Sequence, residues 1–149
     1  DRVLLCTHGG GYAAGSMYSH RKVYAHFAKA VGCKSLILHF RRAPEFTHPA
    51  QVNDTLAAYE WLLAQGYQAR HIASLGDSAG GALATAVCLA ARDKGLPQPA
   101  ASMPISPWYD LEAKGASTRT NADKDCLASE SLTLAMAATF LGGASPHDP

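Results

Sequence analysis

The stretch Gly76-Asp77-Ser78-Ala79-Gly80 lies between two segments of different character. The apolar run 72–75 before it is typical of a strand, and the small and apolar residues from Gly81 to about Arg92 have helical spacing. The region therefore predicts a strand, a sharp turn and a helix. A serine flanked by glycines at such a turn can take a strained conformation that exposes its hydroxyl at the carboxyl end of the sheet. A plain turn with the serine as helix N-cap would explain the same residues.

A second glycine-rich stretch, His8-Gly9-Gly10-Gly11, directly follows the apolar run 3–6. Three consecutive glycines are costly in chain entropy, so they indicate that the backbone itself approaches something closely. In esterases and lipases, an HGGG loop after a strand supplies N–H groups to the oxyanion hole. The HGGG loop and the G-x-S-x-G turn in one chain are much more specific than either alone, and they favour a serine nucleophile.

The sequence resembles the hormone-sensitive-lipase-like family of α/β-hydrolases, which are carboxylesterases with HGGG and GDSAG motifs. Three further segments carry the resemblance. FRRAPE at residues 40–45 is similar to the family's YRLAPE, THPA at 47–50 to its FPA segment, and SPWYDL at 106–111 to its SPWxDL segment. The resemblance covers nearly the whole chain.

The chain departs from the family pattern at three positions. His39 stands where the family usually has Asp, Arg42 where it has Leu, and Asn53 where an acidic residue is common. We expect these changes to affect packing beneath the active site and to leave the nucleophile untouched. Within the SPWYDL segment, we interpret Trp108 and Asp110 as packing and turn residues, with contact to the acyl group as the alternative.

The resemblance implies a role for each residue of the two motifs. Ser78 is the candidate nucleophile for acyl transfer, because a serine hydroxyl with a suitable base attacks an ester carbonyl. The N–H groups of Gly10, Gly11 and Ala79 are the expected oxyanion-hole donors. His8 is expected to fix the glycine loop and not to act as the base.

The base and the acid are harder to find, because in this fold both follow the serine in the order serine, acid, histidine. Asp77 lies beside Ser78 on a sharp turn, so it points away from the hydroxyl and is expected to anchor the elbow. The other Asp and His residues from Ser78 onward are Asp93, Asp110, Asp123, Asp125, His147 and Asp148. No strand beyond 100–106 is predicted before any of them, whereas the family's acid and histidine come from loops after two later strands. We therefore assign neither role within these residues.

The pattern of elements predicts an α/β fold, with a mostly parallel, doubly wound sheet of about four strands. The predicted strands are 2–7, 35–40, 71–75 and 100–106, and the predicted helices are about 19–31, 50–65, 79–94 and 129–141. The second strand reads as buried on both faces, and residues 111–125 as irregular. We expect residues 1–149 to be a partial α/β-hydrolase catalytic domain, with an N-terminal cap and a C-terminal part missing.

Composition narrows the classes of partner. A formal net charge of +1 without a Lys/Arg-rich run gives no sign of nucleic acid or of an anionic membrane as a partner. No apolar run approaches the length of about 18 residues needed to span a bilayer. The four cysteines lie far apart in apolar contexts and are expected to be buried free thiols. The expected partner is a small ester substrate, with no cofactor and no metal; the oligomeric state stays open.

Two alternatives come from other functional classes. The spacing Gly9-x-Gly11-x-x-x-Gly15 after a strand is similar to a loosened dinucleotide fingerprint, and Arg41 with Arg42 could meet an NADP 2′-phosphate. This reductase hypothesis leaves GDSAG unexplained, and an ion pair of the two arginines with Glu45 is the structural alternative. The second alternative is a hydrolase-like binding module that has lost its triad.

Overall fold

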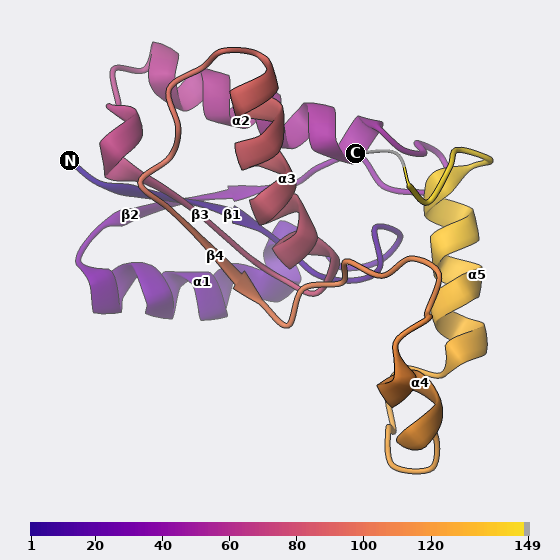
Figure 1. Ribbon diagram of the computed structural model, residues 1–149. Coiled ribbons are helices and arrows are strands. Elements are labelled where there is room, and N and C mark those ends of the chain that lie inside the picture. The colour runs from indigo at the N-terminus through magenta and orange to yellow at the C-terminus, as the bar shows by residue number, and fades with distance from the viewer. Residues whose placement is uncertain (148–149) are drawn as a thin grey trace.

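Four parallel strands form one sheet in the order β2-β1-β3-β4, as Figure 1 shows. The computed structural model describes residues 1–147. The strands are β1 (Val3–Thr7), β2 (Lys34–Leu38), β3 (Ile72–Asp77) and β4 (Ala101–Ile105). Each of them lies within two residues of its predicted bounds.

Helices cover both faces of this sheet, which confirms the doubly wound prediction (Figure 1). Helix α1 (Met17–Val31) packs on one face, and α2 (Ala50–Ala64) with α3 (Ala79–Asp93) packs on the other. A 3-10 turn, η1 (Ala69–His71), leads into β3. Within the described residues, no helix is long and apolar enough to cross a bilayer.

Strand β1 shows how the two layers are separated. Val3 and Leu5 belong to the core beneath α2 and α3, whereas Leu4 and Cys6 belong to the core beneath α1. Successive side chains of a strand point to opposite faces, so an uninterrupted apolar run supplies both layers. The prediction of a strand buried on both faces thus fits β1. It is wrong for β2, whose five residues are exposed or only partly buried because β2 lies at the edge of the four strands.

The buried face of α1 differs from the one that apolar spacing predicts. That spacing puts Val23, Phe27, Ala30 and Val31 on one face of the helix, yet Val23 is 44% and Val31 40% exposed. The fully buried positions are Tyr24 and Ala28. Counting apolar residues overlooks Tyr24 because it carries a hydroxyl, and that hydroxyl finds acceptors on the sheet side.

Residues 107–147, called the arm below, leave the sheet after β4 and carry α4 (Ala116–Thr120) and α5 (Glu130–Leu141) (Figure 1). The prediction of an irregular segment at 111–125 is wrong where α4 forms. Ser129 caps α5 by accepting the N–H of Leu132, as N-cap serines do. The prediction of buried thiols holds for Cys6 and fails for the arm's Cys126, which is exposed; both are free.

Candidate active site

The turn between β3 and α3 brings two backbone segments very close together. Ser78 lies at the turn with φ 53° and ψ −122°, a conformation rarely adopted by residues other than glycine. A Cβ on Gly76 would collide with the carbonyl oxygen of Gly80, and a Cβ on Gly80 would collide with that of Thr7. The two glycines are therefore required by close approach, as a sharp strand-to-helix elbow predicts.

Both peptide groups of Ser78 are held by hydrogen bonds. Its N–H donates to the carbonyl of Ile105 at 2.9 Å, and its carbonyl accepts the N–H of Trp108 at 3.0 Å and that of Ala82 at 3.1 Å. The side chain of Ser78, in contrast, is not held by hydrogen bonds in the described residues. Ser78 is partly exposed, and no residue from 1 to 147 makes a hydrogen bond to its hydroxyl. The structure thus fixes the backbone of Ser78 and leaves the hydroxyl available.

The glycine loop, residues 8–15, closes on itself beside this elbow. The carbonyl of Gly10 accepts the N–H groups of Ala13 at 3.1 Å and of Ala14 at 2.8 Å. A trans peptide directs its C=O and N–H to opposite sides, so this carbonyl fixes the direction of the next N–H, that of Gly11. Gly10 has a φ of 117°, and a Cβ there would overlap the backbone of Ala14.

His8 fixes the preceding peptide in the same way. Its Nδ1 lies 2.8 Å from the carbonyl oxygen of Gly9, which can only accept, so Nδ1 carries the proton. That carbonyl shares its peptide with the N–H of Gly10. The ring is fully buried and stacks on Phe40, with 4.2 Å between ring centroids. Burial lowers the pKa of His8, and its contacts fit the predicted structural role.

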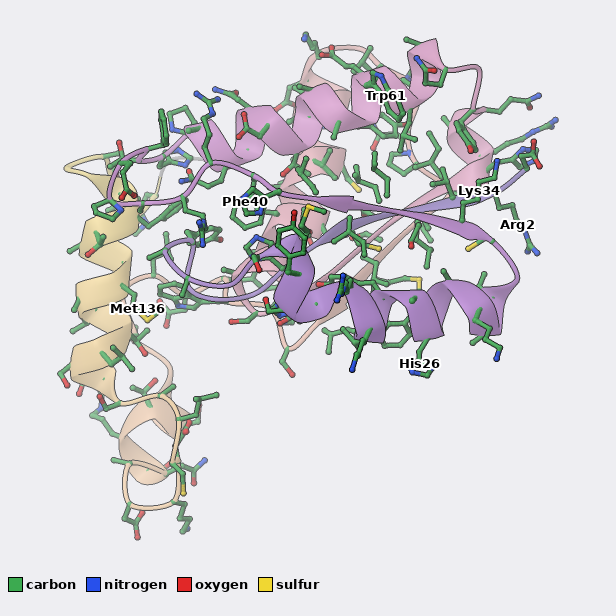
Figure 2. All side chains as sticks on the ribbon, turned by 180° about the vertical axis from the view of Figure 1, so that it is seen from behind. Arg2, His26, Lys34, Phe40, Trp61 and Met136 are labelled. Atoms are coloured by element: carbon green, nitrogen blue, oxygen red, sulfur yellow. The ribbon has the colours of Figure 1, made fainter. Side chains whose placement is uncertain are left out.

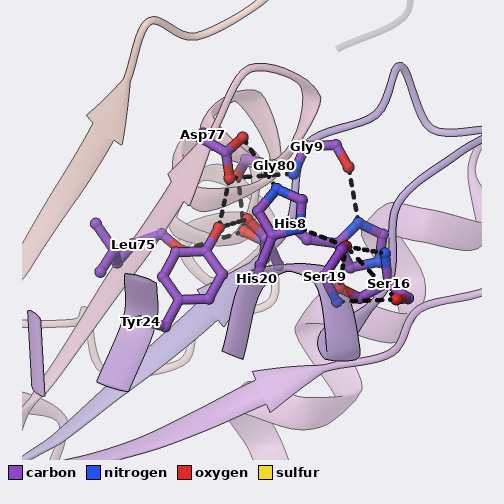
Figure 3. A network of polar contacts seen from close by, with 10 residues as sticks. His8, Gly9, Ser16, Ser19, His20, Tyr24, Leu75, Asp77 and Gly80 are labelled. Atoms are coloured by element: carbon purple, nitrogen blue, oxygen red, sulfur yellow. Dashed lines mark hydrogen bonds and ion pairs between the residues drawn. The ribbon is translucent and has the colours of Figure 1, made fainter. Parts of the chain in front are cut away.

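Two further contacts join the glycine loop to the elbow (Figure 3). Asp77 accepts the N–H of Gly9 on Oδ1 at 3.1 Å, and the hydroxyl of Thr7 donates to the carbonyl of Gly80 at 2.7 Å. Asp77 therefore points away from the Ser78 hydroxyl and anchors the loop, as expected from its place on the turn. The structure thus joins the HGGG and GDSAG segments, which lie about 70 residues apart in the sequence, into one unit.

The three expected oxyanion donors are unused in the described part of the chain. No residue among 1–147 accepts a hydrogen bond from the backbone N–H of Gly10, Gly11 or Ala79. Unpaired backbone donors are uncommon in folded proteins and suit a ligand site. That these three N–H groups serve one substrate oxygen stays a prediction.

The predicted pairing of two arginines with Glu45 is wrong. Arg41 instead forms a two-pronged ion pair with Asp54 of α2, with Nη2 at 2.7 Å from Oδ1. Arg42 donates to the carbonyl of Gly15 at 2.6 Å, at the end of the glycine loop. Sequence proximity favoured Glu45, but the fold brings the start of α2 nearer. With both guanidinium groups bonded inside the chain, neither marks a site for an NADP phosphate.

The downstream acids and His147 do not contact Ser78 in the described residues. Asp110 accepts the N–H groups of Glu112 and Gly115, which makes it the turn residue that the sequence predicts. His147 is exposed, and its Nε2 lies 3.5 Å from a carboxylate oxygen of Glu112. Asp148 lies outside the described residues. No group of three His, Cys, Asp or Glu residues suited to a metal ion is found between residues 1 and 147.

A cavity of about 430 Å³ lies beside the elbow, between α3 and the arm. Its lining includes Tyr12, Trp108 and Phe140, but not Ser78. The ring of Tyr12 stacks on that of Phe140 at 3.7 Å and on that of Trp108 at 5.8 Å, between centroids. These contacts join the glycine loop to the arm and agree with a packing role for Trp108. Sequence reasoning missed Tyr12, although its position directly after HGGG is a usable signal.

Known proteins are similar to this chain in both sequence and structure. A sequence model of the family described as alpha/beta hydrolase fold matches residues 4–149. An acetyl-hydrolase of Streptomyces hygroscopicus is 45% identical over 148 residues, and an ethyl acetate hydrolase of Pseudomonas putida is 35% identical over 123 residues. These alignments cover 99% and 78% of this chain, and 50% and 38% of the relatives.

Solved structures agree with these sequence matches. The crystal structure of an esterase from the bacterial hormone-sensitive lipase family superposes with a TM-score of 0.97 at 49% identity. That alignment covers 99% of this chain and 50% of the esterase. The chain thus spans about half the length of the relatives it matches. By these matches the chain belongs to the α/β-hydrolase fold family, and its resemblance to the hormone-sensitive-lipase-like esterases is confirmed.

Proposed function

We propose that the natural protein carrying this chain hydrolyses short-chain carboxylic esters through an acyl-enzyme on Ser78. The observation that carries the proposal is the Ser78 hydroxyl on a strained turn, joined to a loop in which the N–H groups of Gly10 and Gly11, like that hydroxyl, have no hydrogen-bond partner among residues 1–147. Relatives named acetyl-hydrolase and ethyl acetate hydrolase support a short acyl group.

The chemistry assigned to the residues of this chain has two parts. The Ser78 oxygen attacks the ester carbonyl carbon, and the carbonyl oxygen becomes an oxyanion that accepts hydrogen bonds from the N–H groups of Gly10, Gly11 and Ala79. Collapse of this intermediate releases the alcohol and leaves Ser78 acylated, and water then releases the acid. His8 and the turn at Ala13 hold the donors in direction before substrate arrives, so they need no reorganisation during the reaction.

The reaction also needs a base for the Ser78 proton and an acid to orient that base. We assign neither role among residues 1–147, and His147 pairs with Glu112 on the exposed arm. We propose that both groups come from the half of the relatives' length that this chain does not span, so that residues 1–149 form part of a larger catalytic domain.

The test is replacement of Ser78 by Ala in the natural protein. We expect kcat for p-nitrophenyl acetate to fall by a factor on the order of 10⁶, the scale seen when a triad serine is removed. Ser117→Ala, on the exposed helix α4, is the matched control and is expected to keep wild-type turnover. Turnover by Ser78→Ala within tenfold of wild type would overturn the assignment.

A further inference from the structure

Asp77 connects the elbow to two side chains of α1 that the mechanism above does not use (Figure 3). Its Oδ1 accepts the N–H of Gly9, and the same oxygen lies 2.6 Å from the hydroxyl oxygen of Tyr24. Its Oδ2 lies 3.4 Å from Nε2 of His20. A carboxylate side chain can rotate, so the two contacts from α1 limit which orientation it presents to Gly9.

Tyr24 reaches Asp77 from the buried face of α1. Its hydroxyl oxygen also lies 2.6 Å from the carbonyl oxygen of Thr7, so its proton is shared between the end of β1 and the carboxylate. Burial, followed by the hydrogen bond and charge of Asp77, raises the pKa of Tyr24 well above its usual value. The hydroxyl therefore keeps its proton and remains a hydrogen-bond donor.

His20 holds the other carboxylate oxygen. Nε2 of His20 lies within ion-pair distance of Oδ2, while Nδ1 lies 2.8 Å from the hydroxyl oxygen of Ser19, which itself donates to the carbonyl of Ser16. Ser19 itself belongs to the capping box of α1, because it accepts the N–H of Ser16 and its own N–H donates to the Ser16 hydroxyl. The start of α1 thus sets the position of His20.

This network completes a run of three fixed peptides in the glycine loop. Asp77 fixes the N–H of Gly9, His8 fixes the carbonyl of Gly9, and the turn at Ala13 fixes the carbonyl of Gly10. We infer that Tyr24 and His20 are positioning residues for ester hydrolysis, which hold Asp77 so that the oxyanion donors that follow Gly9 point at the substrate. The inference rests on the proposed function of Ser78 and assigns α1 a part in it.

The experiment compares Tyr24→Phe and His20→Ala with wild type in the natural protein. Matched controls on the same helix are Tyr18→Phe, at a position 66% exposed, and His26→Ala, whose side chain points away from the sheet (Figure 2). Active sites are counted by covalent labelling of Ser78 with a fluorophosphonate. We expect kcat per labelled site to fall between about 10- and 100-fold in the two test variants, with KM unchanged and with wild-type values in the controls.

Two readouts separate positioning from a merely structural role. The affinity for a trifluoromethyl ketone, whose adduct with serine carries an oxyanion, is expected to fall by the same factor as kcat/KM. His20→Gln, whose amide can contact Asp77 in place of the imidazole ring, is expected to recover part of the lost kcat. If the number of labelled sites falls while kcat per labelled site stays at the wild-type value, Tyr24 and His20 are only structural and the inference is wrong.

The outcome for Ser78→Ala distinguishes this inference from the proposed function. If Ser78→Ala abolishes turnover while Tyr24→Phe and His20→Ala keep wild-type kcat and ketone affinity, the inference fails and the nucleophile assignment stands. If Ser78→Ala keeps its turnover, the proposed function fails, and the inference fails with it.

Discussion

The glycine loop and elbow differ from the arm in how much of the backbone the fold constrains. In the first region, a Cβ at Gly76 would collide with the backbone of Gly80, and a Cβ at Gly80 with the backbone of Thr7. In the arm, a Cβ at Gly115 would find its nearest neighbour at 3.8 Å, and Leu127 is 86% exposed. The elbow is thus fixed by close packing of backbone on backbone, whereas most of the arm's contacts with the rest of the chain are made by side chains, with a few backbone hydrogen bonds such as that from His48 to Phe140.

This difference indicates which region can hold groups whose direction must be fixed and which region can vary in sequence. Oxyanion donors act only if their direction is set in advance, and backbone packing sets it without relying on mobile side chains. Side-chain contacts, such as those of Tyr12 with Phe140, can change from one sequence to another without moving the nucleophile. We therefore expect changes at the elbow to affect folding and the chemical step, and changes in the arm to act locally.

The largest effect is expected from a single methyl group at the elbow. Gly80→Ala places a Cβ against the carbonyl oxygens of Thr7 and His8, so the free energy of unfolding is expected to fall by about 4 kcal/mol or more. Gly115→Ala is the control in the arm and is expected to change it by less than about 0.5 kcal/mol. Urea unfolding of both variants measures the contrast, and equal losses would remove the distinction between the regions.

A smaller and more local effect is expected at the contact between the regions. Phe140→Ala removes the ring stacked on Tyr12 from a buried position, a type of change that costs about 3 kcal/mol. Hydrogen exchange is expected to accelerate in α5 and to stay slow in β1 and β3. Leu134→Ala, at a 42% exposed position on the same helix, is the control. Faster exchange throughout the sheet would show that the arm and the sheet unfold as one unit.

The smallest effect is expected from protonation of His8. Burial, and then the nearby charges of His20, His39 and Arg42, lower the pKa of His8, although its hydrogen bond to Gly9 acts in the opposite direction. In addition, Nε2 is buried without an acceptor in the described structure, so a second proton there would be unpaired. The unfolded chain binds this proton more readily than the folded one. The contribution of His8 to the free energy of unfolding is therefore fully present above a pH of about 6.5 and decreases as the pH falls below it.

The measurement compares the free energy of unfolding at pH 7 and pH 5. His8→Asn, whose amide can still donate to the Gly9 carbonyl, is expected to lose less stability between these pH values than wild type does. His26→Asn, at an exposed position, is expected to match wild type. An unchanged loss in His8→Asn would assign the acid sensitivity to another group.

Most of the fold could be predicted from the sequence. The predicted strands and helices end within about two residues of the observed ones, and the two glycine motifs were found to be in contact, as their shared chemistry requires. The wrong predictions concern contacts that form only when separate helices and strands come together in the fold. Arg41 pairs with Asp54 because α2 begins beside it, and Tyr24 is buried because a sheet carbonyl and Asp77 accept its hydroxyl. Neither partner can be read from local spacing.

The alignment of the site depends on the pairing register of β1. Thr7 lies opposite Gly76 of β3, so the glycine loop begins level with the elbow. A slip by one residue would shift the loop by about 3.3 Å and turn Leu4 and Cys6 toward the opposite helical layer. The apolar cores on the two faces of the sheet oppose that slip, because each accepts only one set of β1 side chains. The five buried residues of β1 thus determine the position along the sheet at which the N–H of Gly9 meets the carboxylate of Asp77.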